Sequence, residues 1–84
     1  MHTYGKRART ALVAVVAQNL REIRARKNLS QREVADKAKV SVSYISMLER
    51  GQRSPPLETL EMIAKALGVA PLILLEAGRA RPRK

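Results

Sequence analysis

Short hydroxyl, amide and guanidinium side chains are concentrated between Gln31 and Arg53, and these types suit hydrogen bonding to phosphates and base edges. A helix is expected near the middle of this stretch. A solvent-facing helix normally carries Glu and Lys on its outer side. The side chains expected to face outward here are instead Ser41, Val42, Ser43, Ser46, Met47 and Arg50. Because short hydroxyl and apolar side chains can approach bases closely, the segment is predicted to bind DNA.

Catalytic chemistry has no comparable set of residues in this chain. His2 is the only histidine, cysteine is absent, and the carboxylates show no metal-ligand spacing. Ser30 and Ser41 are better explained as helix caps than as nucleophiles, since no base lies near them in sequence. We therefore expect no enzyme activity, no metal, no cofactor and no small-molecule ligand.

Two short helices joined by a tight turn are predicted to position the DNA-binding side chains. Ser30 and Glu33 have the Ser-x-x-Glu spacing of a capping box, which predicts a helix over residues 31–38. Ser41 is expected to cap a second helix over residues 42–50. Two helices in this arrangement, held at an angle by a small apolar set, are the physical description of a helix-turn-helix.

The rest of the chain is expected to supply a helical scaffold. Thr10 is predicted to cap a helix over residues 11–27, and two further helices are expected over residues 57–67 and 71–77. Apolar side chains recur at helical spacing on these segments. The expected core comprises Leu12, Val16, Leu20, Ile23, Val34, Ala35, Val40, Ile45, Leu48, Leu60, Ile63, Ala64 and Leu67.

The charge distribution favours a polyanionic partner. The chain has 84 residues with 17 Lys and Arg against 7 Asp and Glu, a formal net charge of +10. We expect a basic N-terminal arm over residues 1–9, a DNA-binding domain over residues 10–77 and a basic tail over residues 78–84. The two basic ends are either solvated tails or arms that contact phosphates. With no long apolar run, no membrane association is expected, and the chain is placed in the cytoplasm beside the chromosome.

The stretch from about Leu20 to Leu75 resembles the Cro/lambda-repressor-like family of DNA-binding domains, also called the XRE family. The matching residues are Leu20-Arg-x-Ile-Arg, Leu29-Ser-Gln-x-x-Val-Ala, Val40-Ser-x-Ser-Tyr-Ile-Ser-x-Leu-Glu-Arg-Gly, Arg53-x-Pro-Pro-x-x-x-Leu and Ile63-Ala-x-Ala-Leu-Gly-Val. The resemblance implies an all-α, five-helix bundle whose third helix enters the major groove, usually as a dimer. Restriction-modification controller proteins and small phage-type repressors have this form. Lys39 departs from the family, which usually has glycine in the turn.

The same resemblance implies roles for individual residues. The expected base contacts are Val42, Ser43 and Met47 with Ser46 beside them, and the expected phosphate contacts are Arg24, Gln31, Ser41, Tyr44, Arg50 and Arg53. Arg53 is also placed to reach a base edge. Gln31 is otherwise an ordinary exposed helix start, and Tyr44 otherwise packs partly against the second helix. None of the four base-contact residues can form a bidentate pair with a base, so DNA shape and phosphate contacts should carry much of the recognition.

Arg24 and Glu49 match a structural ion pair of the family. A carboxylate facing phosphates would be repelled, which favours a structural role for Glu49. A partly exposed pair contributes about 0–1 kcal/mol, so we expect its main effect to be the orientation of Arg24 toward the DNA backbone.

A homodimer interface is predicted at residues 72–75, where four apolar residues follow one another. Leu74 and one neighbour can fill the core of the monomer, which leaves Leu72, Ile73 and Leu75 as the expected interface. The alternative is that the helix tilts and buries three of the four. Two other functions remain open: a protein-interaction module such as an antitoxin, and a sequence-indifferent nucleoid or RNA-binding protein.

Overall fold

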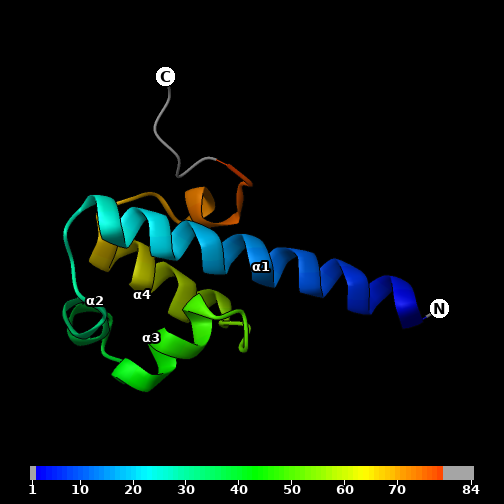
Figure 1. Ribbon diagram of the computed structural model, residues 1–84, viewed down its shortest axis with the longest axis horizontal. Helices are drawn as coiled ribbons and strands as arrows, with labels where there is room; N and C mark the ends of the chain where they lie inside the picture. The colour runs from blue at the N-terminus through cyan, green and yellow to red at the C-terminus, as the bar shows by residue number, and fades with distance from the viewer. Residues whose placement is uncertain (1, 79–84) are drawn as a thin grey trace.

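The computed structural model describes the backbone of residues 2–78 and the side chains of residues 11–78. The regular secondary structure of these residues consists of helices joined by short loops (Figure 1). The elements are α1 (His2–Arg26), α2 (Gln31–Ala38), α3 (Val42–Glu49), α4 (Leu57–Leu67) and the 3₁₀ helix η1 (Pro71–Leu75). The all-α class is confirmed, but the expectation of five α-helices is wrong, because the fifth segment is a short 3₁₀ helix that ends at Leu75.

The first helix is longer than the sequence analysis predicts. α1 begins at His2, so Thr10 lies inside the helix and does not cap it. Residues 6–11 are mostly Lys, Arg and Ala, which favour helix, and a preferred capping residue does not by itself interrupt such a run. α1 therefore crosses the expected boundary between arm and domain, and its N-terminal half projects beyond the bundle (Figure 1). The expected basic tail lies outside the described residues except for Gly78.

The two short helices begin where their caps predict. The Ser30 hydroxyl accepts from the Glu33 N–H at 3.0 Å, and the Glu33 carboxylate accepts from the Ser30 N–H at 2.8 Å. The Ser41 hydroxyl accepts from the Tyr44 N–H at 3.0 Å. These bonds satisfy backbone donors that have no partner inside the helix and so define the first residues of α2 and α3.

Each of the four α-helices is followed by a residue in the left-handed conformation. These residues are Asn28, Lys39, Gly51 and Gly68, with φ values of 57°, 62°, 71° and 75°. After α2, for example, the Val40 N–H donates back to the Ala35 carbonyl at 3.0 Å. This is the Schellman arrangement, which reverses the chain within two residues. Lys39 adopts it without being glycine, at a cost of roughly 1–2 kcal/mol, and thereby makes the tight turn that links α2 to α3.

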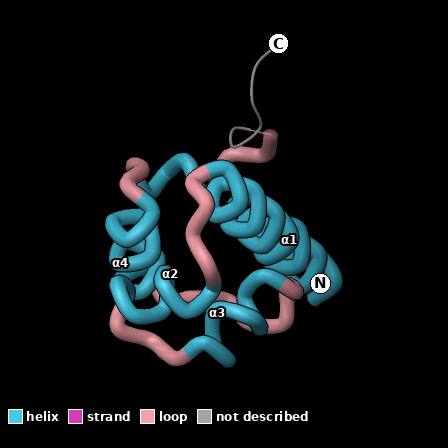
Figure 2. The backbone as a smooth tube through the Cα atoms, turned by 60° about the vertical axis from the view of Figure 1, so that its left-hand side comes forward, coloured by secondary structure: helices cyan, strands magenta, loops and turns pink. Residues whose placement is uncertain are grey.

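One apolar core joins all the elements. α2 packs against α3 and α4, while α1 packs against α3 and η1 (Figure 2). The core residues are Val16, Leu20, Ile23, Val34, Ala35, Ala38, Ile45, Leu48, Leu60, Ile63, Ala64, Leu67 and Leu74. Val40 is half-buried against this core. Leu12 does not belong to it and is 51 % exposed, whereas Val16, one turn later on α1, is buried.

Asn19 fixes η1 to α1. Its side-chain amide is 1 % exposed and donates to the carbonyls of Ile73, Leu74 and Glu76 at 3.2, 3.0 and 3.0 Å. η1 is a helix of five residues, and the Ile73 carbonyl at its end also accepts from the Glu76 N–H at 3.3 Å. The buried Asn19 amide adds the bonds that attach the end of η1 to α1.

Candidate nucleic-acid interface

A stripe of side chains on α3 faces away from the core. Ser43, Ser46 and Met47, together with Arg50 at the C-terminal cap of α3, follow one another at the helical spacing that places them on one face. Ser43 and Arg50 are exposed, and Ser46 and Met47 are half-buried. Ile45 and Leu48, which lie on the opposite face, are buried. Three of the four residues expected to contact bases therefore share a single accessible surface. The fourth, Val42, is half-buried and packs partly against the core.

A buried carboxylate holds α3 in place. Glu49 is 4 % exposed and accepts from Arg24 Nε at 2.5 Å and from Arg24 Nη2 at 3.0 Å. Arg24 Nη1 donates to the Leu29 carbonyl at 2.9 Å, and Arg21 donates to the Glu49 backbone carbonyl. The pair is less accessible than the partly exposed contact expected from the sequence, with side-chain exposures of 21 % and 5 %. All three guanidinium nitrogens of Arg24 are engaged within the protein.

The hydrogen bond to Glu49 raises the pKa of Arg24 above its ordinary value, with the negative charge of Glu49 adding to the effect and burial opposing it. A raised pKa in the folded state means that the stabilisation is present at low and neutral pH and is lost only as the pH rises past that pKa. The Arg24 guanidinium therefore stays charged throughout the physiological range.

Gln31 belongs to the same network. Its side-chain amide donates to Glu49 Oε1 at 2.9 Å, so the side chain points toward α3 and is half-buried. The second N–H of that amide is the side chain's only further donor. Gln31 is the first residue of α2, as predicted, and its side chain also connects α2 to α3, which was not predicted.

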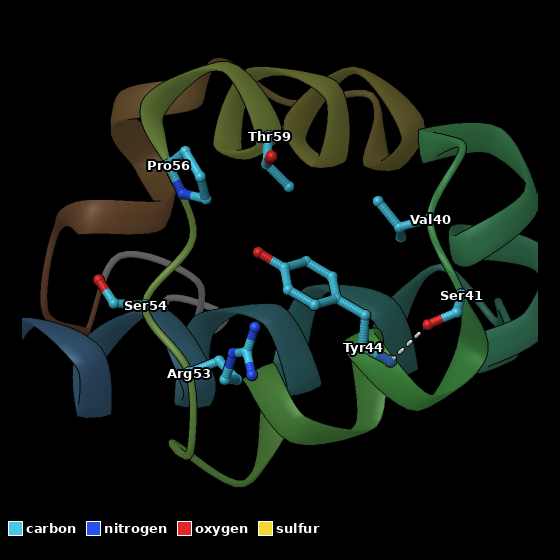
Figure 3. Close-up of a pocket in the computed structure, with 7 residues that line it drawn as sticks. All are labelled: Val40, Ser41, Tyr44, Arg53, Ser54, Pro56 and Thr59. Atoms are coloured by element: carbon cyan, nitrogen blue, oxygen red, sulfur yellow. Dashed lines mark hydrogen bonds between the residues drawn. The ribbon is translucent and has the colours of Figure 1, made fainter.

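A groove lies beside α3 and brings three of the expected phosphate-contact residues together. It has a volume of about 480 Å³ and is lined by Val40, Ser41, Tyr44, Arg53, Ser54, Pro56 and Thr59. The Tyr44 ring extends into the groove with its hydroxyl toward Pro56 and Thr59, and the Arg53 side chain lies beside the ring (Figure 3). Hydroxyl and guanidinium donors therefore meet at one edge of the helix-turn-helix.

Arg50 and Ser46 contact each other along α3. Arg50 Nη1 donates to Ser46 Oγ at 2.6 Å, and Arg50 Nε donates to Gln52 Oε1 at 3.3 Å. Because Ser46 precedes Arg50 by four residues, the guanidinium lies back along the outer face of the helix.

An apolar groove lies on another part of the surface, between α1, the start of α4 and η1. It has a volume of about 230 Å³ and is lined by Leu12, Val13, Val16, Ser54, Pro55, Leu57, Leu60 and Leu75. Leu57 is 76 % exposed at its rim. Of the expected interface residues, Leu72 is 68 % exposed, while Ile73 and Leu75 are half-buried and Leu74 is buried.

Two residues of these sites, Asn19 and Leu57, were not predicted from the sequence. Asn19 is a polar residue at a core position of α1, three residues after Val16 and four before Ile23. That position was the available signal, since a buried amide needs partners. Leu57 was counted only as a helix start, although an apolar first residue of a helix is often free to face outward.

Comparisons with known proteins agree with this geometry. Residues 20–74 match the family model described as helix-turn-helix. The control protein C.BamHI of Bacillus amyloliquefaciens is 45 % identical over 60 residues, which cover 70 % of this chain and 74 % of the relative. The crystal structure of the restriction-modification controller protein C.AhdI from Aeromonas hydrophila superposes with a TM-score of 0.73 at 38 % identity, covering 76 % of this chain and 97 % of that one.

The chain therefore belongs to this helix-turn-helix family, and the resemblance to XRE-type repressors and controller proteins is confirmed. Some relatives are longer. The transcriptional regulator DdrOP3 of Deinococcus deserti is 41 % identical over 61 residues, which cover 73 % of this chain and 47 % of the relative. The chain thus spans about half the length of that protein. Within residues 2–78, no helix is long and apolar enough to cross a membrane.

Proposed function

We propose that the chain is a sequence-specific regulator of transcription that binds double-stranded DNA as a homodimer, with α3 in the major groove. The observation that carries this proposal is the accessible stripe of Ser43, Ser46 and Met47 on a helix whose opposite face is fixed by Glu49. A recognition helix must present side chains at a fixed depth, and the buried ion pair supplies that rigidity.

The proposed DNA contacts follow from accessibility. Ser43, Ser46 and Met47 would lie over base edges, with Val42 contributing only the part of its side chain that is exposed. Ser41, Tyr44 and Arg53 line one groove and are suited to phosphate oxygens. Arg24 and Gln31 reach a phosphate only through the N–H donors that Glu49 and Leu29 do not use.

The basic ends of the chain are proposed to add contacts to phosphates. Their positive charge is not offset locally, because all seven acidic residues lie between Glu22 and Glu76. Such contacts would be independent of sequence and sensitive to salt.

The homodimer is proposed to form around η1. Leu72 is exposed there, and Ile73 and Leu75 are partly accessible beside it. The apolar groove that contains Leu75 continues this surface to Leu12 and Leu57. A two-fold interface would present two copies of α3 to half-sites about 34 Å apart, which is one turn of DNA.

The test is a salt titration of binding to a duplex obtained by binding-site selection and to a scrambled duplex of the same length. Both affinities should fall as salt rises, because counterions are released in both complexes. A sequence-specific protein keeps an excess of roughly 4–10 kcal/mol on the selected duplex. Equal affinity for the two duplexes would instead identify a sequence-indifferent nucleoid protein. Co-purification of a different protein that binds at the apolar groove would favour a protein-interaction module.

A further inference from the structure

The exposed stripe of α3 contains one side chain capable of bidentate base recognition, and it is Arg50. Ser43, Ser46 and Met47 offer single hydroxyls or apolar contact. Arg50 is the next member of the same face, three residues beyond Met47 and seven beyond Ser43. Its position at the end of the helix would suit a phosphate contact if the side chain extended away from α3.

The guanidinium does not extend away from α3. The bond of 2.6 Å from Nη1 to Ser46 Oγ draws it back by one helical turn, over the part of the face where base contacts are expected. On the other side of the guanidinium, Arg50 Nε donates to Gln52 Oε1 at 3.3 Å. Both contacts are made by neutral acceptors, so the positive charge is not neutralised by them.

The remaining donors have the geometry that guanine requires. An arginine side chain has five N–H groups, and Ser46 and Gln52 each accept from one of them. Both hydrogens of Nη2 and the second hydrogen of Nη1 remain unused among the described residues. These two nitrogens form a fork that matches the O6 and N7 acceptors of guanine in the major groove.

We propose that Arg50 reads a guanine in each half-site and that Ser46 acts as its positioning residue. This inference rests on the proposed function, since it assumes that α3 enters the major groove. It changes the role expected for Arg50 from a phosphate contact to a specificity-determining base contact. It also supplies the bidentate contact that the other residues of the stripe lack.

The test compares binding sites selected by the wild-type protein and by Arg50→Lys, which keeps the charge but loses the fork. The wild-type protein should select guanine at one position per half-site. Arg50→Lys should lose the preference at that position by roughly 5- to 150-fold and keep the rest of the motif. Arg50 is exposed, and thermal melting of the variant checks that the fold is intact.

Two further measurements address the same contact. Replacing that guanine by 7-deazaguanine removes the N7 acceptor and should weaken binding by the wild-type protein more than binding by Arg50→Lys, which lacks the planar fork. Ser46→Ala should reduce the guanine preference without changing affinity for a scrambled duplex, an effect that a purely structural role would not produce.

The failure of this inference is distinguishable from the failure of the proposed function. An unchanged motif, together with an equal loss of affinity for all duplexes in Arg50→Lys, would identify Arg50 as a phosphate contact and overturn the inference alone. If the wild-type protein selects no motif, the proposed function and the inference both fall.

Discussion

The side-chain amide of Gln31 donates to Glu49 Oε1 at 2.9 Å, so the first residue of α2 is bonded to the last residue of α3. The same carboxylate binds Arg24 of α1. Three helices therefore meet at one buried charge, directly behind the surface proposed to face DNA. The angle between the two helices of the helix-turn-helix depends on polar contacts as well as on the apolar core.

Removal of this carboxylate should destabilise the fold. Glu49→Gln leaves a mostly buried guanidinium without its countercharge, and we expect the free energy of unfolding to fall by about 2–4 kcal/mol in urea denaturation. Glu61→Gln on the exposed face of α4 is the matched control and should change it by less than about 0.5 kcal/mol. Equal effects of the two substitutions would show that the ion pair is not structurally important.

Asn19 should control the order of η1. Asn19→Ala removes the donor to three carbonyls, so we expect a loss of about 1–3 kcal/mol and faster amide exchange at residues 73–76. Gln18→Ala, at the neighbouring half-buried amide, should leave exchange in η1 unchanged. Wild-type exchange in Asn19→Ala would mean that Leu74 alone holds this segment.

The proposed homodimer should dissociate when charge is placed on the exposed apolar residues of its proposed interface. Leu57→Asp combined with Leu72→Asp alters two side chains that are 76 % and 68 % exposed, so the monomer should still fold. Sedimentation should then show monomers, with weakened binding because the half-sites are no longer joined. Met62→Asp, an exposed residue of α4 that does not line the apolar groove, is the control. Dimers of the double variant with intact helical content would place the interface elsewhere.

The basic C-terminal residues should contribute to affinity without contributing to specificity. Deletion of residues 80–84 is expected to weaken binding to selected and scrambled duplexes alike. The slope of log K against log salt should decrease by about 0.9 for each phosphate contact that is lost. An unchanged slope would indicate that these residues only maintain solubility.

The parts of the fold set by local chemistry were predictable from the sequence. Ser30, Glu33 and Ser41 define helix starts through bonds to residues three positions away, and periodic apolar side chains define the inner faces. Each of these features depends on neighbours in the sequence.

The remaining features depend on residues that are far apart. The partners of Asn19 lie more than 50 positions away, and Gln31 and Glu49 are 18 positions apart. No local pattern distinguishes a side chain that reaches such a partner from one that faces solvent. The start of α1 was missed for a different reason, since the capping preference of Thr10 was weaker than the helix propensity on both sides of it.

The binding free energy of Met47→Ala on selected and scrambled duplexes tests the central claim most directly. Met47 lies in the middle of the accessible stripe of α3 and makes no polar contact that could be lost within the protein. If this face reads bases in the major groove, the substitution should cost about 1–3 kcal/mol on the selected duplex and leave binding to the scrambled duplex and thermal stability close to wild type. An equal loss on both duplexes, or a loss that only follows a fall in stability, would contradict the placement of α3 in the groove.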